Sequence, residues 1–203
     1  MRKKTRPRKR LLGGLSEQLK SVADTHKGKR ITLWFQDEAR IGQKGRVTHR
    51  WWWRGKRAPG KCDNRYTSAY LFAAVRAGSD EAHAWVMPHA NKQAMQHFLD
   101  SFSAELAPDE HAVMTLDQAA WHDVRALDVP DNVTLLPLPP YSPELNPIER
   151  VFLHLKARHL SHRLLDDYEA IVDATCKAWR DLLADAGRLA SLTGYPWIME
   201  CVS

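Results

Sequence analysis

The sequence predicts a mixed α/β domain in which antiparallel strands come first and helices then alternate with strands. Three observations lead to this fold class. β-Branched and aromatic runs at hairpin-like spacing fill residues 31–87. The apolar spacing then becomes helical over residues 91–106. Beyond that helix, short apolar strands over 112–116 and 133–136 alternate with helical segments.

Length and composition allow one well-cored domain. The chain has 203 residues, of which 44% are hydrophobic and 27% charged. No apolar run approaches the roughly 20 residues of a membrane helix, so we expect no membrane partner. Residues 11–15 are too short for the apolar part of a secretory signal. Cys62, Cys176 and Cys201 are scattered and form no CxxC pair, which predicts free thiols and a cytoplasmic location.

The net charge of +6 comes from the N-terminus. Residues 1–10 carry seven Lys and Arg and no acid, whereas the other 193 residues carry 23 Lys and Arg against 24 Asp and Glu. We expect residues 1–29 to be a basic tail or linker with at most a helical turn or two near 15–22, ahead of a folded domain over 30–203 that ends in helices. Such a tail suits contact with nucleic-acid phosphates, and a solvated end explains the charge equally well.

The first part of the domain reads as antiparallel strands. Residues 31–35 form a buried strand that ends in acids at Asp37 and Glu38. A second strand is expected over 46–53 and a third over 68–77, and residues 82–87 read as a further extension. Hairpin-like spacing makes these strands antiparallel.

The second part alternates helices and strands. A helix over 91–106 precedes a strand over 112–116 that ends on Asp117, with a short helix through Trp121 after it. The next strand, 133–136, leads into a proline-rich segment, and apolar stripes predict two more helices, one after Pro147 and one over 166–186. This order is that of the ribonuclease H-like fold, so we predict a mixed five-stranded sheet with flanking helices.

Residues 137–149 are the most unusual segment of the chain. Five of the eleven residues from 137 to 147 are proline, which excludes a helix and favours an extended backbone. Asn146 suits an N-cap, Pro147 the first helical position, and Glu149 the capping-box spacing. A stiff segment that leads into a sharply started helix holds one carboxylate in place, although capping alone also explains Glu149.

Three acids follow strands or begin a helix, namely Asp37, Asp117 and Glu149. If the strands before the two aspartates are parallel neighbours, their carboxylates lie side by side, and a bound cation relieves the repulsion between them. Oxygen ligands suit Mg²⁺ or Mn²⁺, and two such ions suit displacement at phosphorus. Each acid also has an ordinary interpretation as a turn or cap residue, and periodicity alone does not choose among them and the nearby acids Glu38, Asp123 and Glu144.

Three segments in this order resemble the catalytic domain of bacterial insertion-sequence transposases of the mariner-type superfamily: Trp34 to Arg40, Leu116 to His122, and Leu138 to Glu149. The similarity covers about residues 30–200, and its last segment is the most specific. The resemblance implies a ribonuclease H-like fold and an Asp-Asp-Glu triad that is both catalytic and metal-ligating. Carried over by position, the triad is Asp37, Asp117 and Glu149, with Glu144 outside it. The resemblance also implies two divalent ions, Mg²⁺ or Mn²⁺, and insertion at a TA dinucleotide.

The chain departs from this family in three respects. Gln118 stands where Asn or Gly is common, and the 31 residues between Asp117 and Glu149 form a slightly tighter gap than in many relatives. Only 36 residues precede Asp37, and they hold no second helix for a helix-turn-helix module. We therefore expect the catalytic half alone, acting on DNA as a homo-oligomer, with end recognition supplied by a separate or fused helix-turn-helix polypeptide.

Further DNA contacts are expected from two places. Trp121 and His122 follow the second aspartate within a helical turn, and His122 is a candidate donor to the scissile phosphate. Arg54, Lys56 and Arg57 lie in a basic loop that suits phosphate contact. The aromatic run 51–53 favours core packing over base stacking, and the histidines His154, His159 and His162 lack the spacing of a zinc site.

These observations predict a DNA transposase of an insertion sequence that cuts phosphodiesters at element ends and transfers the strands into TA-containing DNA. Two alternatives remain open at this point: a ribonuclease H-like nuclease that only hydrolyses, and an inactive, DNA-binding remnant of a transposase. A glycosidase built on two of the carboxylates is a distant third.

Overall fold

The computed structural model describes residues 5–43, 53–56, 65–118, 126–140, 142–161 and 163–202. Five strands form a mixed sheet in the order β3-β2-β1-β4-β5. β1 (Arg30–Gly42) pairs antiparallel with β2 (Ser68–Arg76), which pairs antiparallel with β3 (Ala82–Met87). β4 (Glu110–Leu116) runs parallel to both β1 and β5 (Val133–Pro137). The five-stranded mixed sheet predicted from the sequence is therefore confirmed.

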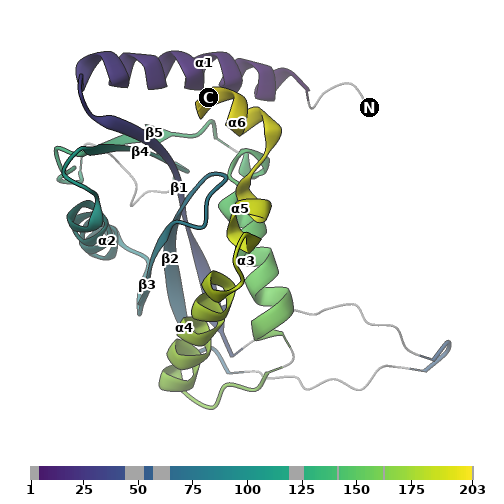
Figure 1. The fold of residues 1–203 in the computed structure, drawn as a ribbon. Helices are drawn as coiled ribbons and strands as arrows, with labels where there is room; N and C mark the ends of the chain where they lie inside the picture. The colour runs from purple at the N-terminus through teal and green to yellow at the C-terminus, as the bar shows by residue number, and fades with distance from the viewer. Residues whose placement is uncertain are drawn as a thin grey trace.

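Helices cover both faces of this sheet (Figure 1). α2 (Lys92–Glu105) lies on one face and connects β3 to β4. α3 (Ile148–Leu155), α4 (Tyr168–Ala184) and α5 (Arg188–Thr193) lie on the other, and α6 (Pro196–Val202) follows them. None of the described helices combines the length and the apolar character needed to cross a membrane.

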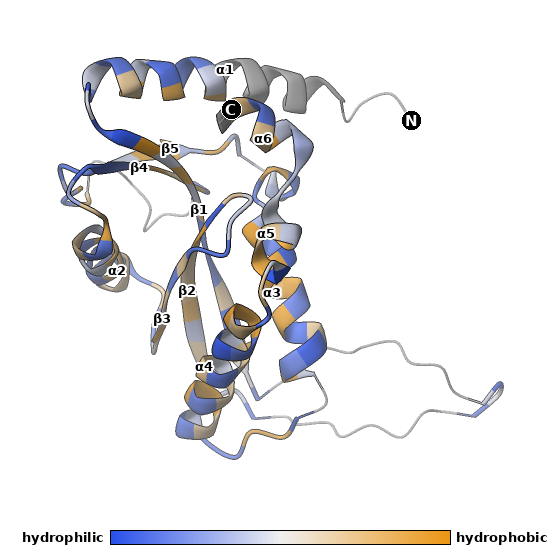
Figure 2. Cartoon of the chain, viewed as in Figure 1, coloured by the Kyte–Doolittle hydropathy of each residue, from blue (hydrophilic) through white to orange (hydrophobic). Residues whose placement is uncertain are grey.

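The alternation of side chains along the strands divides the core into two layers. On β1, Leu33 and Phe35 belong to the layer under α3 and α4, whereas Trp34 belongs to the layer under α2. The α2 layer contains Met95 and Phe98, which recur at helical spacing and are fully buried. Hydrophobic and hydrophilic residues accordingly alternate along α2 and α4 in Figure 2, as in helices with one buried face.

The N-terminal segment differs from our expectation. α1 (Thr5–Thr25) is one continuous helix rather than a basic tail with a turn or two, and it packs along α6. Leu15 and Leu19, one turn apart, are buried in the core, because this stripe is apolar even though the segment as a whole is polar. Just beyond α1, the ring of His26 stacks on that of His111 in β4 at 3.7 Å. The second half of α1 thus belongs to the folded domain, and the predicted boundary near residue 29 is wrong for it.

Two strand predictions also need comment. Residues 82–87 form β3, a separate edge strand, rather than an extension of the strand before it. Most of the predicted strand 46–53 lies outside the described residues; Trp53 is described and is 76% exposed. The predicted short helix through Trp121 also lies outside the described part of the chain. Of the cysteines, Cys176 and Cys201 are free, as expected, and Cys62 is not described.

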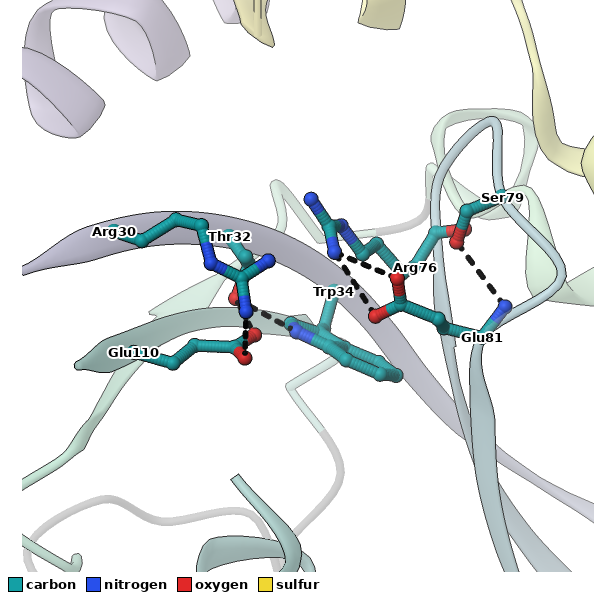
Figure 3. Close-up of polar contacts among 7 residues, drawn as sticks. All are labelled: Arg30, Thr32, Trp34, Arg76, Ser79, Glu81 and Glu110. Atoms are coloured by element: carbon teal, nitrogen blue, oxygen red, sulfur yellow. Dashed lines mark hydrogen bonds and ion pairs between the residues drawn. The ribbon is translucent and has the colours of Figure 1, made fainter. Parts of the chain in front are cut away.

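A buried polar network fixes the register between β1 and β4 (Figure 3). The carboxylate of Glu110 accepts hydrogen bonds from the Arg30 guanidinium at 2.8 Å and from the Thr32 hydroxyl at 2.6 Å. The Trp34 indole donates in turn to Thr32 at 2.9 Å. Because Arg30 pairs with Glu110 at the start of both strands, the network anchors the end of the sheet opposite to the acids that follow β4. A second ion pair in Figure 3, between Arg76 and Glu81, closes the turn from β2 to β3.

Candidate active site

Asp37 lies within β1 rather than at its end. β1 continues to Gly42 in antiparallel pairing with β2, and Asp37 pairs with Ala73. The parallel pairing with β4, however, stops at Phe35 and Thr115. Asp37 therefore stands where β1 has only one neighbouring strand, and this opening lets a polar side chain occupy the middle of a strand. Its carboxylate accepts a hydrogen bond from the backbone amide of Glu38 at 2.8 Å.

Asp117 directly follows β4. It lies two residues beyond the last parallel pair, as Asp37 does on β1. Phe35 and Val113 belong to the core layer under α3, so the alternation of the strands directs Asp37 and Asp117 to that same face. The strands before the two aspartates are therefore parallel neighbours, which is the condition under which the sequence predicts that their carboxylates lie side by side.

The proline-rich segment leaves β5 beside these acids. The amide of Leu138 donates to the carbonyl of Leu116 at 2.8 Å, and the side-chain amide of Gln118 donates to the Leu138 carbonyl at 2.9 Å. These two bonds hold the start of the segment against the end of β4. A short 3₁₀ turn, Pro143–Leu145, then leads to α3.

Asn146 connects the start of α3 to β1. Its side-chain amide donates to the carbonyl of Gln36 at 3.0 Å, and its side-chain oxygen accepts from the amide of Ile148 at 3.4 Å. Asn146 has an extended backbone and is only 5% exposed. Asn146 thus binds the first turn of α3, whose N-cap is Pro147 rather than the predicted Asn146. It also fastens the helix to the residue before Asp37.

Glu149 does not complete the predicted capping box. The backbone amide of Asn146, which a capping-box glutamate would bind, donates instead to the carbonyl of Pro143 at 3.0 Å, inside the 3₁₀ turn. Glu149 lies in the first turn of α3, on the helix whose buried residues pack on the face that carries Asp37. Glu149 lines the same cleft as Asp37 and Asp117, and its charge acts on Asp37.

A cleft of about 470 Å³ brings these side chains together. Glu144 is exposed and does not line this cleft, which separates it from Glu149. Ten described residues line the cleft: Asp37, Asp117, Gln118, Leu138, Pro139, Pro140, Ser142, Pro143, Asn146 and Glu149.

The electrostatics of the cleft are those of crowded carboxylates. The pKa of Asp37 is raised from an ordinary 3.8 to about 8. Burial is the largest cause and the charge of Glu38 the next; the hydrogen bond from the Glu38 amide opposes them. The charges of Glu149 and Asp117 raise the pKa of Asp37 further. Without a cation, a proton occupies Asp37 over most of the neutral range.

The carboxylate oxygens of Asp37, Asp117 and Glu149 are ligands that suit a hard divalent cation. A cation would also offset the repulsion that raises the pKa of Asp37. Among the described residues, however, no group of three or more His, Cys, Asp or Glu side chains surrounds one point closely enough to hold an ion. The charges of both Asp117 and Glu149 act on Asp37, so Asp37 is the acid that the other two have in common.

Of the remaining predicted site residues, Arg54 and Lys56 are described and do not line the cleft. Both are exposed in a turn between β1 and β2. Trp121, His122 and Arg57 lie outside the described residues. His154 and His159 lie near each other, with ring centroids 6.1 Å apart, and belong to no metal-binding group among the described residues. His162 is not described.

Sequence reasoning missed the second role of Asn146. The sequence predicts only a helix cap there, because the spacing of Asn146 from Glu149 is a local signal. The bond to Gln36 spans 110 positions of the chain. The available signal is indirect: between Pro143 and Pro147, Asn146 is the only residue whose side chain can donate a hydrogen bond.

Comparisons with known proteins agree with this arrangement. Residues 32–172 match the family model described as DDE superfamily endonuclease. The chain is 40% identical over 129 residues to uncharacterized protein y4pE/y4sA of Sinorhizobium fredii (strain NBRC 101917 / NGR234), a match that covers 64% of this chain and 96% of that protein.

Solved structures extend the likeness to the fold. The catalytic domain of Mos1 mariner transposase matches with a TM-score of 0.55 and 17% identity, covering 100% of this chain and 95% of that one. The Mos1 transposase paired-end complex with left transposon end matches with a TM-score of 0.63 and 19% identity. The chain spans about three fifths of the Mos1 chains in such complexes, 63% in this one and 61% in the Strand Transfer Complex.

The fold is therefore the ribonuclease H-like fold of transposase catalytic cores, as the sequence predicted. The matched region runs from β1 into α4 and includes every acid of the cleft. The chain belongs to the DDE superfamily endonucleases.

Proposed function

We propose that this chain is the catalytic half of a bacterial insertion-sequence transposase, with Asp37, Asp117 and Glu149 as its catalytic residues. One observation carries the proposal: acids from β1, from the end of β4 and from α3 line one cleft. The described alternatives, Glu38 and Glu144, do not line it. Family membership and the Mos1 fold support the same reaction class.

The three acids are also the proposed ligands of divalent metal. Two Mg²⁺ or Mn²⁺ ions, when bound, would lower the pKa of the attacking hydroxyl and stabilise the leaving oxygen at phosphorus. The solved Mos1 paired-end complexes with Mg and with Mn support this choice of ions. Asp37, Asp117 and Glu149 would together hold these ions.

The protein's own part in the reaction is to position these groups. Asp37 must give up its proton before it can ligate an ion, so cation binding and deprotonation are coupled. Asn146 keeps α3 against β1, which fixes the separation of Glu149 from Asp37. Gln118 fixes the proline-rich wall of the cleft beside Asp117.

Chemically, the proposed reaction has two displacements at phosphorus. In the first, water attacks the phosphodiester at the element end, the bond to the 3′-oxygen breaks, and a free 3′-hydroxyl and a 5′-phosphate result. In the second, that 3′-hydroxyl attacks a phosphodiester of TA-containing target DNA, so one P–O bond forms as another breaks. Both use the same cleft, and DNA is the partner in each.

The assembly around this cleft is also proposed rather than observed. The chain would act on DNA as a homo-oligomer, with a separate or fused helix-turn-helix polypeptide recognising element ends, in the bacterial cytoplasm. Trp121, His122, Arg54, Lys56 and Arg57 remain candidate DNA contacts.

The direct test is cleavage of a supercoiled, TA-containing plasmid by the purified chain with Mg²⁺ or Mn²⁺. We expect metal-dependent nicking that Asp37→Asn and Asp117→Asn abolish and that Glu144→Gln leaves intact. Nicking that persists in both aspartate variants contradicts the proposal. Nicked products without joined strands, in the presence of pre-cut element ends, identify a hydrolytic nuclease instead.

A further inference from the structure

A second cleft, of about 440 Å³, adjoins the first. Glu149 lines both, so it marks the point where the two meet. The first cleft is lined by three acids and no base, whereas the second carries three basic side chains and Glu149 as its single acid. The basic residues of the second cleft are Arg40, Lys156 and Arg163.

One face of α3, together with the residue that follows the helix, lines this second cleft. The lining residues Glu149, Leu153 and Lys156 recur at intervals of four and three, the spacing of one helix face. Leu153 is 48% exposed, which leaves an apolar surface between the two charged side chains. At 1.5 Å per residue, Glu149 and Lys156 are about 10 Å apart along the helix axis.

The helical backbone changes from α to π at Lys156, one of the basic residues of the second cleft. Lys156 begins a π-helical turn, Lys156–Leu160, that follows α3 directly. Such turns are rare and occur frequently at functional sites, since they redirect the side chains that follow. Leu160 and Ser161, at the end of this turn, line the cleft with Lys156.

The opposite wall is held in place from the sheet. The side-chain amide of Gln43, just beyond β1, donates to the carbonyls of Leu165 at 2.9 Å and Asp166 at 3.0 Å. Arg65 donates to the same two carbonyls at 3.2 Å and 2.6 Å. Arg163 lies two residues before Leu165, so these hydrogen bonds hold the backbone close to Arg163 beside the second cleft.

Arg40 comes from β1 itself, three residues after Asp37. Its guanidinium donates to the hydroxyl of Ser68 at 3.1 Å and to the carbonyl of Tyr66 at 3.5 Å. Arg40 alternates along β1 with Ala39 and Ile41, which belong to the core layer under α3, so these two bonds hold its guanidinium on the other face of the sheet. Arg40 therefore borders the second cleft from β1, and Lys156 and Arg163 are the two other basic side chains that line it.

The geometry points to this second cleft as the binding site for the sugar–phosphate backbone of the DNA strand that leaves the catalytic cleft. Lys156 and Arg163 contact its phosphates, and Leu153 packs against its sugars. The assignment rests on the proposed function, which places a scissile phosphate beside Glu149.

Binding of a short duplex oligonucleotide, followed by fluorescence anisotropy in the absence of Mg²⁺ and Mn²⁺, tests the assignment without cleavage. We expect Lys156→Gln/Arg163→Gln to weaken binding about tenfold or more. The slope of log K against log salt should fall by about two, one for each phosphate that the variant no longer neutralises. Arg158→Gln is the matched control. Arg158 is exposed on the same π-helical turn and does not line the cleft, so this variant should bind about as well as the native chain.

Equal affinity and salt slope for the double variant and the native chain overturn the assignment, as does an equal loss of affinity in the Arg158→Gln control. Neither result affects the proposed function, which depends on metal-dependent nicking by Asp37 and Asp117. Conversely, loss of affinity in the double variant alongside nicking that survives Asp37→Asn retains this DNA site and rejects the proposed triad.

Discussion

The side-chain amide of Asn146 donates a 3.0 Å hydrogen bond to the backbone carbonyl of Gln36. This bond joins the start of α3, three residues before Glu149, to the residue that precedes Asp37 on β1. Both partners are almost completely buried. Two proposed catalytic acids that lie 112 positions apart in the chain are thus fixed relative to each other by one buried amide.

Asn146→Ala should therefore reduce activity more than it reduces stability. Removal of the buried hydrogen bond leaves the Gln36 carbonyl without this donor, which costs about 1–3 kcal/mol in the free energy of unfolding. We expect the nicking rate to fall at least about tenfold, because Glu149 is then no longer held at a fixed distance from Asp37. Chemical denaturation and plasmid nicking measure the two effects.

Asn91→Ala is the matched control for that experiment. Asn91 caps α2 through a 2.9 Å bond to the amide of Ala94, and α2 lies on the opposite face of the sheet. Its removal should cost about 1 kcal/mol and leave the nicking rate near native at a temperature where both variants are folded. Similar rates for the two alanine variants would show that Asn146 acts through stability alone.

The raised pKa of Asp37 predicts how stability depends on pH. The folded chain holds a proton on Asp37 up to about pH 8, whereas the unfolded chain releases it near the ordinary pKa of 3.8. Between these values the folded state binds more protons, so this group's contribution to stability falls as pH rises from about 4 to about 8. Asp37→Asn, which resembles the protonated side chain, should be more stable than the native chain at about pH 8, by on the order of a few kcal/mol.

Divalent metal should stabilise the native chain relative to Asp37→Asn at about pH 8. Binding of Mg²⁺ or Mn²⁺ replaces the proton, so it should raise the melting temperature of the native chain more at about pH 8 than at about pH 6. Asp37→Asn should gain little at either pH. If the native chain and Asp37→Asn have the same pH dependence without metal, Asp37 does not carry the shifted proton.

α1 supplies a prediction about the N-terminal segment. Leu15→Ala should lower the free energy of unfolding by about 2–5 kcal/mol, because Leu15 is 2% exposed in the core. Glu17→Ala, at an exposed position of the same helix, should leave it nearly unchanged. Equal stability of the two variants, measured by thermal or chemical denaturation, would mean that α1 is a loose tail after all.

The strands and the order of the sheet could be predicted from the sequence because their signals are local. The apolar runs before Asp37 and Asp117 are strong, and parallel neighbours place the acids that follow them at one edge. The continuation of β1 past Asp37 was not predictable, since a run of Gln, Asp and Glu has low strand propensity and is held there by β2. The extent of α1 was hidden for a similar reason, because tertiary contacts stabilise a helix that has few apolar residues.

The candidate site divides in the same way. Residue types and spacing, together with the family resemblance, selected Asp37, Asp117 and Glu149 in advance, and the structure brings these three into one cleft. The connection of Asn146 to Gln36 and the basic cleft beside Glu149 depend on elements far apart in sequence. No periodic pattern encodes such contacts, so only the folded chain reveals them.

Calorimetric titration of the purified chain with Mn²⁺ at about pH 8 shows directly whether the three acids bind metal. We expect heat of binding with release of a proton for the native chain and for Glu144→Gln, fewer bound ions for Glu149→Gln, and no binding for Asp37→Asn. The absence of binding by the native chain, or native-like binding by Asp37→Asn, would contradict the proposal that these acids form a metal-dependent catalytic centre.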